Sequence, residues 1–582
     1  MDLLVRGDGA PNRIMRPFRL FQTIRWLSAA QLSAQLRHRL RGLTESPEAW
    51  LARPVPADPG IRWKPPADLL PPGAQANRAD ALLAGNFTFL NHTEPLGWPP
   101  RWAELAVPAL WEYNLHYFEY LWALPYAEGR HVALDWIERH TLARGRVGWD
   151  PYPVSLRLMN WCGYFYGRHR EATQADAPLR ASLWASIQLQ ADWLAAHLEF
   201  HLRGNHLLEN AAALAACGAC FAGERAEAWL RAGLEVLARE LPEQVLADGG
   251  HFERSPMYQL RVTYVLALLA NTGSERAGAV VAEPLAKLRA ALGSLCHPDG
   301  EIALLNDSAV GIANRPADLV DADSRAGSFA LPQTGYYGAR SAAGHYVICD
   351  AAPIGPDYLP GHAHGDLFSF ELSLAGRRVI VDAGVHGYEA DAMRSYCRST
   401  RAHNTVEVEG QDQCEFWAAF RVARRGRPRD VLWRERGDGF ELGGWHDGYE
   451  RLPGRPRHRR RFRWHDAGVL LVRDTIRARR PVAVRSRLHL HPDCQLLEVS
   501  DRAARVRYPR GECIIAFDGP GALSQEPSVY CPEFGVARDA VALLYESHGA
   551  TVETGFCVAS GAGDLAFDLA SGARRGGERY SW

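Results

Sequence analysis

Lysine is almost absent from this chain: of its 66 basic residues only Lys64 and Lys287 are lysines, and the other 64 are arginines. With 67 acidic residues the net charge is −1, so the overall charge favours neither nucleic acid nor an anionic membrane as a partner. Arginine this abundant is weak evidence for an anionic ligand. Only arginines at particular positions in a motif therefore carry an argument.

Long apolar runs and a cysteine framework are also missing. No run approaches the length of a membrane span, and the N-terminus MDLLVRGDGAPNRIMRPFRL lacks the apolar centre of a signal peptide. The eleven cysteines have no framework spacing, and the one CxxC, Cys217 and Cys220, lies in an apolar helix-like run. Core packing is favoured there over metal or redox chemistry. Dispersed free cysteines suit a reducing compartment. With no signal peptide recognised, we expect a cytoplasmic protein without an integral membrane segment; a periplasmic location or export by another route is the alternative.

Tryptophan is missing between Trp229 and Trp417, and this gap separates two halves of different periodicity. Before the gap, apolar residues recur at spacings of three and four, which predicts helices. The clearest such segments are Leu179–Phe200, His206–Phe221, Glu224–Val245, Ser255–Ala270 and Ala277–Leu295. The first eighty residues are rich in proline and arginine and hold one expected amphipathic helix near Phe18–Leu40.

After about Phe329 the period changes to two, which predicts strands. The expected strands include Gly344–Asp350, Leu367–Leu374, Arg377–Asp382, Asn404–Glu409, Val469–Val472, Val482–Leu490 and Ala540–Leu544. Runs of strands after runs of helices predict separate α and β domains. We therefore expect an α+β multidomain protein with a lead-in segment over 1–80, a helical domain over 81–328 and an antiparallel β domain over 329–582, with the functional cleft between the last two.

Two motifs on the helical side carry candidate catalytic residues. GNHLLEN opens an apolar helix, so Asn205 and His206 lie near a helix N-terminus, where unpaired N–H groups favour a carboxylate or a developing oxyanion. Helix capping is the alternative for Asn205. DGGHFERSPMYQL contains a Ser-Pro helix start, which places Tyr258 in the first turn. Core packing is the alternative for Tyr258.

On the strand side, LPGHAHGDLFSFEL places His362 and His364 two residues apart at the mouth of an expected strand, on the same face. Asp382 and His403 follow in RRVIVDAG and RSTRAHNTVEV. Two histidines and an aspartate from three segments form a plausible divalent site of the zinc type. A two-residue hairpin between the first two strands would point Asp382 and His364 to opposite faces. A longer loop or a kink at Gly365 restores the same face.

Taken in order along the chain, these motifs resemble the heparinase II/III-like polysaccharide lyases, a group that includes related alginate lyases. WEYNLHYFEYLW and WDPYPVSLRLMNW, further upstream, are similar to the helical part of bacterial members. The resemblance covers roughly residues 100–420. It implies an incomplete (α/α) toroid followed by an antiparallel β-sandwich domain, with the active cleft between them. It also implies an anionic polysaccharide as the partner, cleaved by β-elimination at the C4–O bond of a uronic acid.

The resemblance implies four catalytic residues, namely Asn205, His206, Tyr258 and His362. It also implies a structural divalent metal, most simply Zn²⁺, held by His364, Asp382 and His403. Some residues are candidate substrate contacts for which packing is the alternative, namely Arg157, Asn160, Arg254, Arg401 and Trp149. If the elimination is syn, Tyr258 serves as both base and acid, and its pKa then has to fall well below the usual value of about 10.

Two other functions use the same residues. A uronyl C5-epimerase also removes the C5 proton but does not expel O4, and the apparent lack of a signal peptide suits such a biosynthetic enzyme. A catalytically silent glycan-binding protein is the third reading. We expect a lyase acting on a bacterial exopolysaccharide, because no motif indicates a dedicated sulfate pocket. The sequence does not fix the polysaccharide, endo or exo action, or the oligomeric state.

Overall fold

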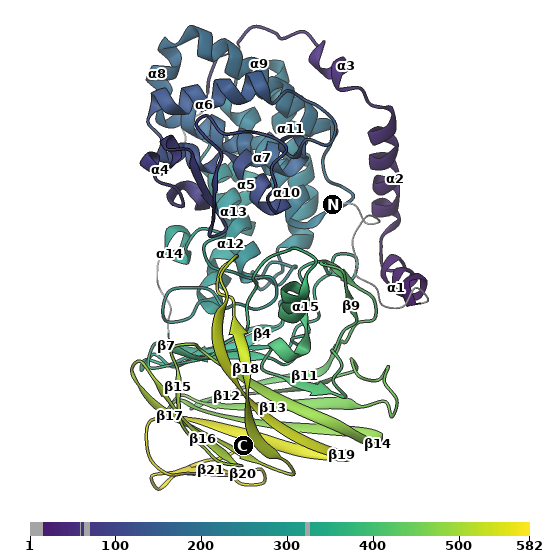
Figure 1. The fold of residues 1–582 in the computed structure, drawn as a ribbon, viewed down its shortest axis with the longest axis vertical. Coiled ribbons are helices and arrows are strands. Elements are labelled where there is room, and N and C mark those ends of the chain that lie inside the picture. The colour runs from purple at the N-terminus through teal and green to yellow at the C-terminus, as the bar shows by residue number, and fades with distance from the viewer. Residues whose placement is uncertain (1–14, 59, 63–69, 321–325) are drawn as a thin grey trace.

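The computed structural model describes residues 15–58, 60–62, 70–320 and 326–582. A helical part is followed by a large antiparallel sheet, with α12 (Pro256–Ala270) reaching the boundary between them (Figure 1). The chain is thus an α+β protein, as predicted from the change of periodicity. None of the helices within the described ranges has the length and apolar composition needed to cross a membrane.

The lead-in segment differs from its prediction. Instead of one amphipathic helix it forms α1 (Met15–Ile24), α2 (Ala29–Thr44) and the short α3 (Pro47–Leu51). In Figure 1, α2 and α3 lie beside the main helical body, whereas α1 lies lower, on the side of β9 (Phe416–Trp417). The break occurs because Ser28 caps α2: its side chain accepts a hydrogen bond from the Gln31 N–H, and the Gln31 side chain accepts from the Ser28 N–H. Residues 1–14, 59 and 63–69 of the predicted lead-in lie outside the described part of the chain.

The helices predicted from apolar spacing are present, with ends shifted by a few residues. Before them come α4 (Ala79–Leu83), α5 (Ala109–Tyr117), α6 (Tyr126–Arg139), α7 (Pro151–Trp161) and α8 (Arg170–Ala175). The predicted set itself is α9 (Ala177–Ala196), α10 (Gly204–Cys220), α11 (Gly223–Gln244), α12 and α13 (Glu275–Leu292), followed by the short α14 (Pro316–Leu319). Cys217 and Cys220 are free thiols buried where α10 packs, in agreement with the packing interpretation.

The sheet holds 15 strands in the described chain, and every strand pairing in it is antiparallel. Two segments predicted as separate strands form one, β14 (Val469–Leu490), which pairs along most of its length with β19 (Arg538–Ser560). A bulge between Arg477 and Val482 interrupts the pairing, which is why the sequence period lapses there. The other strands of the sheet are β3 (Gly327–Leu331), β4 (Tyr336–Arg340), β5 (Tyr346–Asp350), β6 (Phe370–Leu374), β7 (Arg377–Ile380), β8 (Val406–Val408), β11 (Pro428–Arg436), β12 (Gly439–His446), β13 (Arg457–His465), β15 (Gln495–Val499), β16 (Ala503–Tyr508), β17 (Gly511–Asp518) and β18 (Ala522–Tyr530).

Strands β4 and β5 join the helical part to the sheet, because both of their faces are buried. One face packs against the end of the helical part, through Tyr336, Tyr346 and Ile348 with Ala291 and Leu295. The opposite face belongs to the sheet core, through Tyr337, Ala339, Val347 and Cys349. This explains why these strands carry charged residues only at their last positions, Arg340 and Asp350, rather than alternating apolar with polar residues.

A hydrogen bond and an ion pair hold the segment after α13 against β6 and β7. The Leu304 N–H donates to the Glu371 carboxylate at 2.6 Å, and Arg378 Nε donates to Asp299 Oδ2 at 2.7 Å. This segment leads directly into Asp307, which is fully buried. The sheet therefore fixes the position at which Asp307 enters the boundary between the two parts.

The ion pair between Asp299 and Arg378 should contribute to the free energy of unfolding, and this contribution should be lost at low pH. Burial raises the pKa of Asp299, but the Arg378 guanidinium outweighs it and lowers that pKa to about 2. A carboxyl whose pKa is depressed in the folded state stabilises above its unfolded pKa and loses that contribution as pH falls. We expect Asp299→Asn to reduce the free energy of unfolding by about 2 kcal/mol at neutral pH and about half of that at pH 3, measured by denaturant titration. An equal difference at both pH values would contradict this assignment.

Candidate active site

His362 lies in a loop rather than in a strand, because β6 begins only at Phe370. Its Nδ1 lies 2.9 Å from Asp307 Oδ2, and its ring packs on Tyr258 with 4.1 Å between centroids. Its Nε2 lies 3.5 Å from the Glu253 carboxylate, longer than a good hydrogen bond. When Nδ1–H donates to Asp307, Nε2 carries the lone pair. The nitrogen on the Glu253 side of the ring is therefore the basic one.

Asp307 is the centre of this network and was not identified from the sequence. Its carboxylate also accepts from His364 Nε2 at 2.8 Å and from both terminal nitrogens of Arg394, which lies on α15 (Ala392–Arg398). Burial raises the pKa of Asp307, but Arg394 and the two histidines outweigh it and hold that pKa well below its usual range. Arg394 thus favours the ionised form of the carboxylate that orients both His362 and His364.

Tyr258 lies in the first turn of α12, as predicted, because Ser255 caps the helix and Pro256 occupies its first position. Its hydroxyl lies 3.0 Å from the hydroxyl of Tyr388, another residue that sequence reasoning missed. Burial, followed by the neighbouring Tyr388, raises the pKa of Tyr258 well above its usual value. In this state Tyr258 is a neutral hydroxyl, the form that donates a proton, and the lowered pKa required for a tyrosinate base is not present.

Asn205 and His206 begin α10 from the helical side. Asn205 does not cap the helix, because Arg203 occupies the capping position; the Asn205 N–H instead donates to Glu253 Oε1 at 2.8 Å. Gly204 must be a glycine, since its φ is +58° and an added Cβ would lie 2.2 Å from the same oxygen. Glu253 therefore lies between the start of α10, which it contacts by a hydrogen bond, and His362.

His206 is positioned by the carboxylate of Glu199. Its Nδ1 lies 3.2 Å from Glu199, and its ring packs on Tyr152 with 4.4 Å between centroids. Burial lowers the pKa of His206, but Glu199 outweighs this and the pKa is raised above its usual value. This side of the site therefore favours the cationic form of the imidazole.

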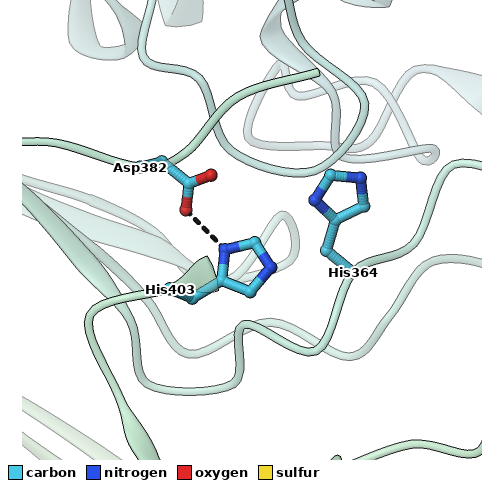
Figure 2. Close-up of side chains that lie close together, drawn as sticks. All are labelled: His364, Asp382 and His403. Atoms are coloured by element: carbon cyan, nitrogen blue, oxygen red, sulfur yellow. Dashed lines mark hydrogen bonds and ion pairs between the residues drawn. The ribbon is translucent and has the colours of Figure 1, made fainter. Parts of the chain in front are cut away.

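The three predicted metal ligands converge. His364, Asp382 and His403 are fully buried, and one ligand atom from each lies within 4.8 Å of the others (Figure 2). His403 Nδ1 hydrogen-bonds Asp382 Oδ2 at 2.7 Å, while His364 Nδ1 and His403 Nε2 have no hydrogen-bond partner within the described chain. Burying such nitrogens without a partner costs about 1–3 kcal/mol each. Two unpartnered imidazole nitrogens beside a carboxylate fit a divalent cation.

Three predicted substrate contacts lie in the helical core instead. Arg157, Asn160 and Trp149 are buried, and the first is fully enclosed. Arg157 Nε donates to Gln190 Oε1 at 2.8 Å, and Asn160 Nδ2 donates to the Tyr117 carbonyl at 2.9 Å. Apart from Arg157 Nη2, which has no hydrogen-bond partner within the described chain, the polar groups of Arg157 and Asn160 are used within the fold, which supports the packing alternative over a surface that touches substrate.

The two remaining arginines differ from each other. Arg254 donates to the carbonyls of Thr334 and Phe252, both at 2.9 Å, so its guanidinium braces the loop that precedes α12. Arg401 is exposed two residues before His403. Of the five predicted contacts, Arg401 alone presents an exposed guanidinium near the ligand triad.

In this structure, helix starts of the helical part lie close to histidine-bearing loops of an antiparallel sheet. This arrangement defines a known class of protein. Residues 117–315 match the family described as Heparinase II/III N-terminus, and residues 323–582 match Heparinase II/III-like, C-terminal. The chain belongs to the heparinase II/III family.

Particular relatives agree with this assignment. A heparin-sulfate lyase of Pedobacter heparinus is 29% identical over 338 residues, which cover 51% of this chain and 50% of that protein. The chain thus spans about half the length of this curated relative. The FtsZ-localized protein C of Caulobacter vibrioides is 26% identical over 494 residues, covering 79% of this chain and 80% of that protein.

Solved structures show the same fold. The crystal structure of heparinase III superposes with a TM-score of 0.70 at 15% identity, covering 96% of this chain and 99% of that one. A mutant of heparan sulfate lyase HepC from Pedobacter heparinus gives a TM-score of 0.61 at 19% identity, covering 92% and 93%. The similarity extends over both the helical part and the sheet.

Proposed function

We propose that this protein is a polysaccharide lyase that cleaves a uronate-containing anionic polysaccharide by β-elimination. The observation that carries the proposal is the pairing of an oriented imidazole with a neutral phenol: His362 and Tyr258 pack ring on ring, with Asp307 behind the imidazole. An elimination needs a base for the C5 proton and an acid for the leaving O4. These two side chains supply that pair.

The C5 proton is removed by His362 Nε2, since Asp307 holds the opposite nitrogen. The proton lies α to a carboxylate, so its removal builds negative charge on that group. The Asn205 side-chain amide, whose Nδ2 lies 3.5 Å from Glu209 Oε1, and a cationic His206 lie on the helical side of the site to stabilise this charge as it develops. Tyr258 gives its proton to O4 as the C4–O bond breaks, which agrees with its raised pKa.

A divalent cation, with zinc as the first choice, would be held by His364, Asp382 and His403. When bound, the cation would supply positive charge and would hold together the three loop segments that carry its ligands. His364 shares Asp307 with His362, so the ligand set and the base are fastened to the same carboxylate. The proposed role of the site is structural support of the base.

Metal content tests this assignment directly. We expect about one equivalent of a divalent ion in protein purified without chelator, and less than about a tenth of an equivalent after His403→Ala. The control is His548→Ala, which removes an exposed imidazole elsewhere on the sheet. A chelator should lower the melting temperature of the wild type and of the control, but not of His403→Ala. Less than a tenth of an equivalent in the wild type would contradict the site.

The activity is tested by incubating the protein with heparan sulfate, alginate and uronate-containing bacterial exopolysaccharides. Elimination produces an unsaturated uronate, so the ultraviolet absorbance of its conjugated double bond should rise with at least one polymer. The absence of any rise on polymers that the protein binds would contradict lyase activity. A bacterial exopolysaccharide is the substrate we favour, in line with the sequence.

A second candidate function is a localisation role. The match to FtsZ-localized protein C covers 80% of that protein, against half of the Pedobacter heparin-sulfate lyase. Sedimentation of the chain with assembled FtsZ tests this candidate. Co-sedimentation without any elimination activity would favour it over the lyase, and the reverse result would exclude it.

A further inference from the structure

A groove crosses the face of β11, β12, β13 and β14 that points away from the sheet core. It encloses about 710 Å³ and shares no lining residue with the candidate active site. Its lining includes five arginines, namely Arg434, Arg459, Arg460, Arg461 and Arg473, two carboxylates, Asp430 and Glu441, and Gly443. The register places Arg461 opposite both Gly443 and Arg473, so this glycine lies among guanidiniums.

Strand β13 explains why the basic side chains gather on this face. Its residues alternate, with Arg459 and Arg461 in the groove and Arg460 fully buried between them. Arg460 makes two hydrogen bonds to the buried Asp474 and one to the carbonyl of Asn404, the residue after the metal ligand His403. The guanidinium of Arg460 is thus engaged in hydrogen bonds within the fold, whereas the side chains of Arg459 and Arg461 reach solvent.

The charges in the groove are only partly neutralised. Arg461 pairs with Glu441 at 3.3 Å and Arg473 with Glu553 at 2.8 Å. The guanidiniums of Arg434 and Arg459 form no hydrogen bond or ion pair with any described residue. The groove therefore offers free guanidiniums beside carboxylates, which suits a ligand that carries both acidic groups and hydroxyls.

The two adjacent glycines of β12, Gly443 and Gly444, are explained by different features of the structure. An added Cβ at Gly444 would lie 2.6 Å from Phe368 Cζ, so packing on the inner face requires that glycine. An added Cβ at Gly443 would meet nothing closer than the Arg460 carbonyl at 3.6 Å, an ordinary contact. The fold does not require Gly443, and its missing side chain leaves the groove open.

We propose that this groove binds a segment of an anionic polysaccharide at a distance from the catalytic residues. Arg434 and Arg459 would take the carboxylate or sulfate groups, and Glu441 and Glu553 would accept hydroxyls. The identity of the ligand rests on the proposed function, since the bound segment belongs to the polymer that the enzyme cleaves. An anionic membrane fits less well, because the surface is concave and three carboxylates, Asp430, Glu441 and Glu553, line or flank it.

The test uses full-length protein carrying His362→Ala, so that the polymer is not degraded. Affinity electrophoresis through gels containing heparan sulfate, alginate or neutral dextran measures retardation. Arg434→Glu with Arg459→Glu should weaken the apparent affinity for at least one anionic polymer by roughly fivefold or more. Gly443→Trp should weaken it similarly without changing the charge. Dextran should retard none of the proteins.

A matched control changes the same charge elsewhere. Arg505→Glu with Arg574→Glu reverses two exposed arginines outside the groove and should leave retardation unchanged. Equal retardation of the groove variant and the wild type, or no retardation by any anionic polymer, would overturn the proposal. Loss of binding only to phosphatidylglycerol vesicles in the groove variant would overturn it in favour of a membrane. The experiment measures binding by a catalytically inactive variant. Its result therefore does not depend on lyase activity, and a failure of the proposed lyase function can be distinguished from a failure of the groove proposal.

Discussion

Tyr258→Phe is expected to lower kcat by about 10²–10⁴-fold while leaving KM within a few-fold of the wild type. The substitution removes the hydroxyl that protonates the leaving O4 and keeps the ring that packs on His362. Because the pKa of Tyr258 is raised, the wild-type residue carries its proton throughout the neutral range. The loss should therefore fall on the chemical step rather than on binding.

Tyr388→Phe is the matched control for this prediction. Its hydroxyl lies 3.0 Å from that of Tyr258 and has the same chemistry, but the proposed mechanism gives it no proton to transfer. Removal of one such hydrogen bond should reduce kcat by about tenfold or less. If Tyr258→Phe retained more than about a tenth of the wild-type rate, or if the two variants were equally impaired, Tyr258 would not be the acid.

Asp307→Asn is expected to reduce kcat by about 10³–10⁴-fold, as when an amide replaces a carboxylate that orients a catalytic imidazole. The amide no longer requires a proton on His362 Nδ1, so Nε2 loses its role as the base. The variant also weakens the contact to His364 and leaves Arg394 less well paired. Initial rates should be measured together with thermal unfolding, so that a loss of fold is distinguished from a loss of catalysis.

Two comparisons isolate the orienting role. Asp299→Asn makes the same chemical change on the same segment without touching His362, and it should retain near wild-type kcat. In a His362→Ala background, Asp307→Asn should cause little further loss, because residues that act as a unit are not additive. A full additional loss in the double variant would show that Asp307 acts independently of His362.

Much of the fold could be predicted from the sequence, because the helices and most strands have strong periodicity. The main error lay at His362 and His364. Alternating Leu, Ser, Glu and Phe residues predicted a strand from Leu367, but the strand begins at Phe370, and the histidines lie in the loop before it. The predicted conflict of strand faces between His364 and Asp382 therefore does not arise, although the hairpin loop does have two residues.

Asp307 could not be identified for a different reason. It lies in a segment without helix or strand period, and its partners are about 55 and 87 positions away in the chain. Its only sequence signal is an Asn-Asp pair within the apolar run LLNDSAV, which equally fits a turn. Arg157 shows the opposite difficulty: a charged residue in a family-like motif turned out to be fully buried, and sequence alone does not report burial.

The most direct test of the central claim is a proton NMR time course in D₂O with the polymer that gives the strongest ultraviolet signal, or with the whole panel if none does. The account predicts a new vinyl H4 resonance that grows with time in the wild type and is absent in Tyr258→Phe and His362→Ala. Loss of H5 intensity without a vinyl resonance would contradict β-elimination and would identify the same site as that of a C5-epimerase.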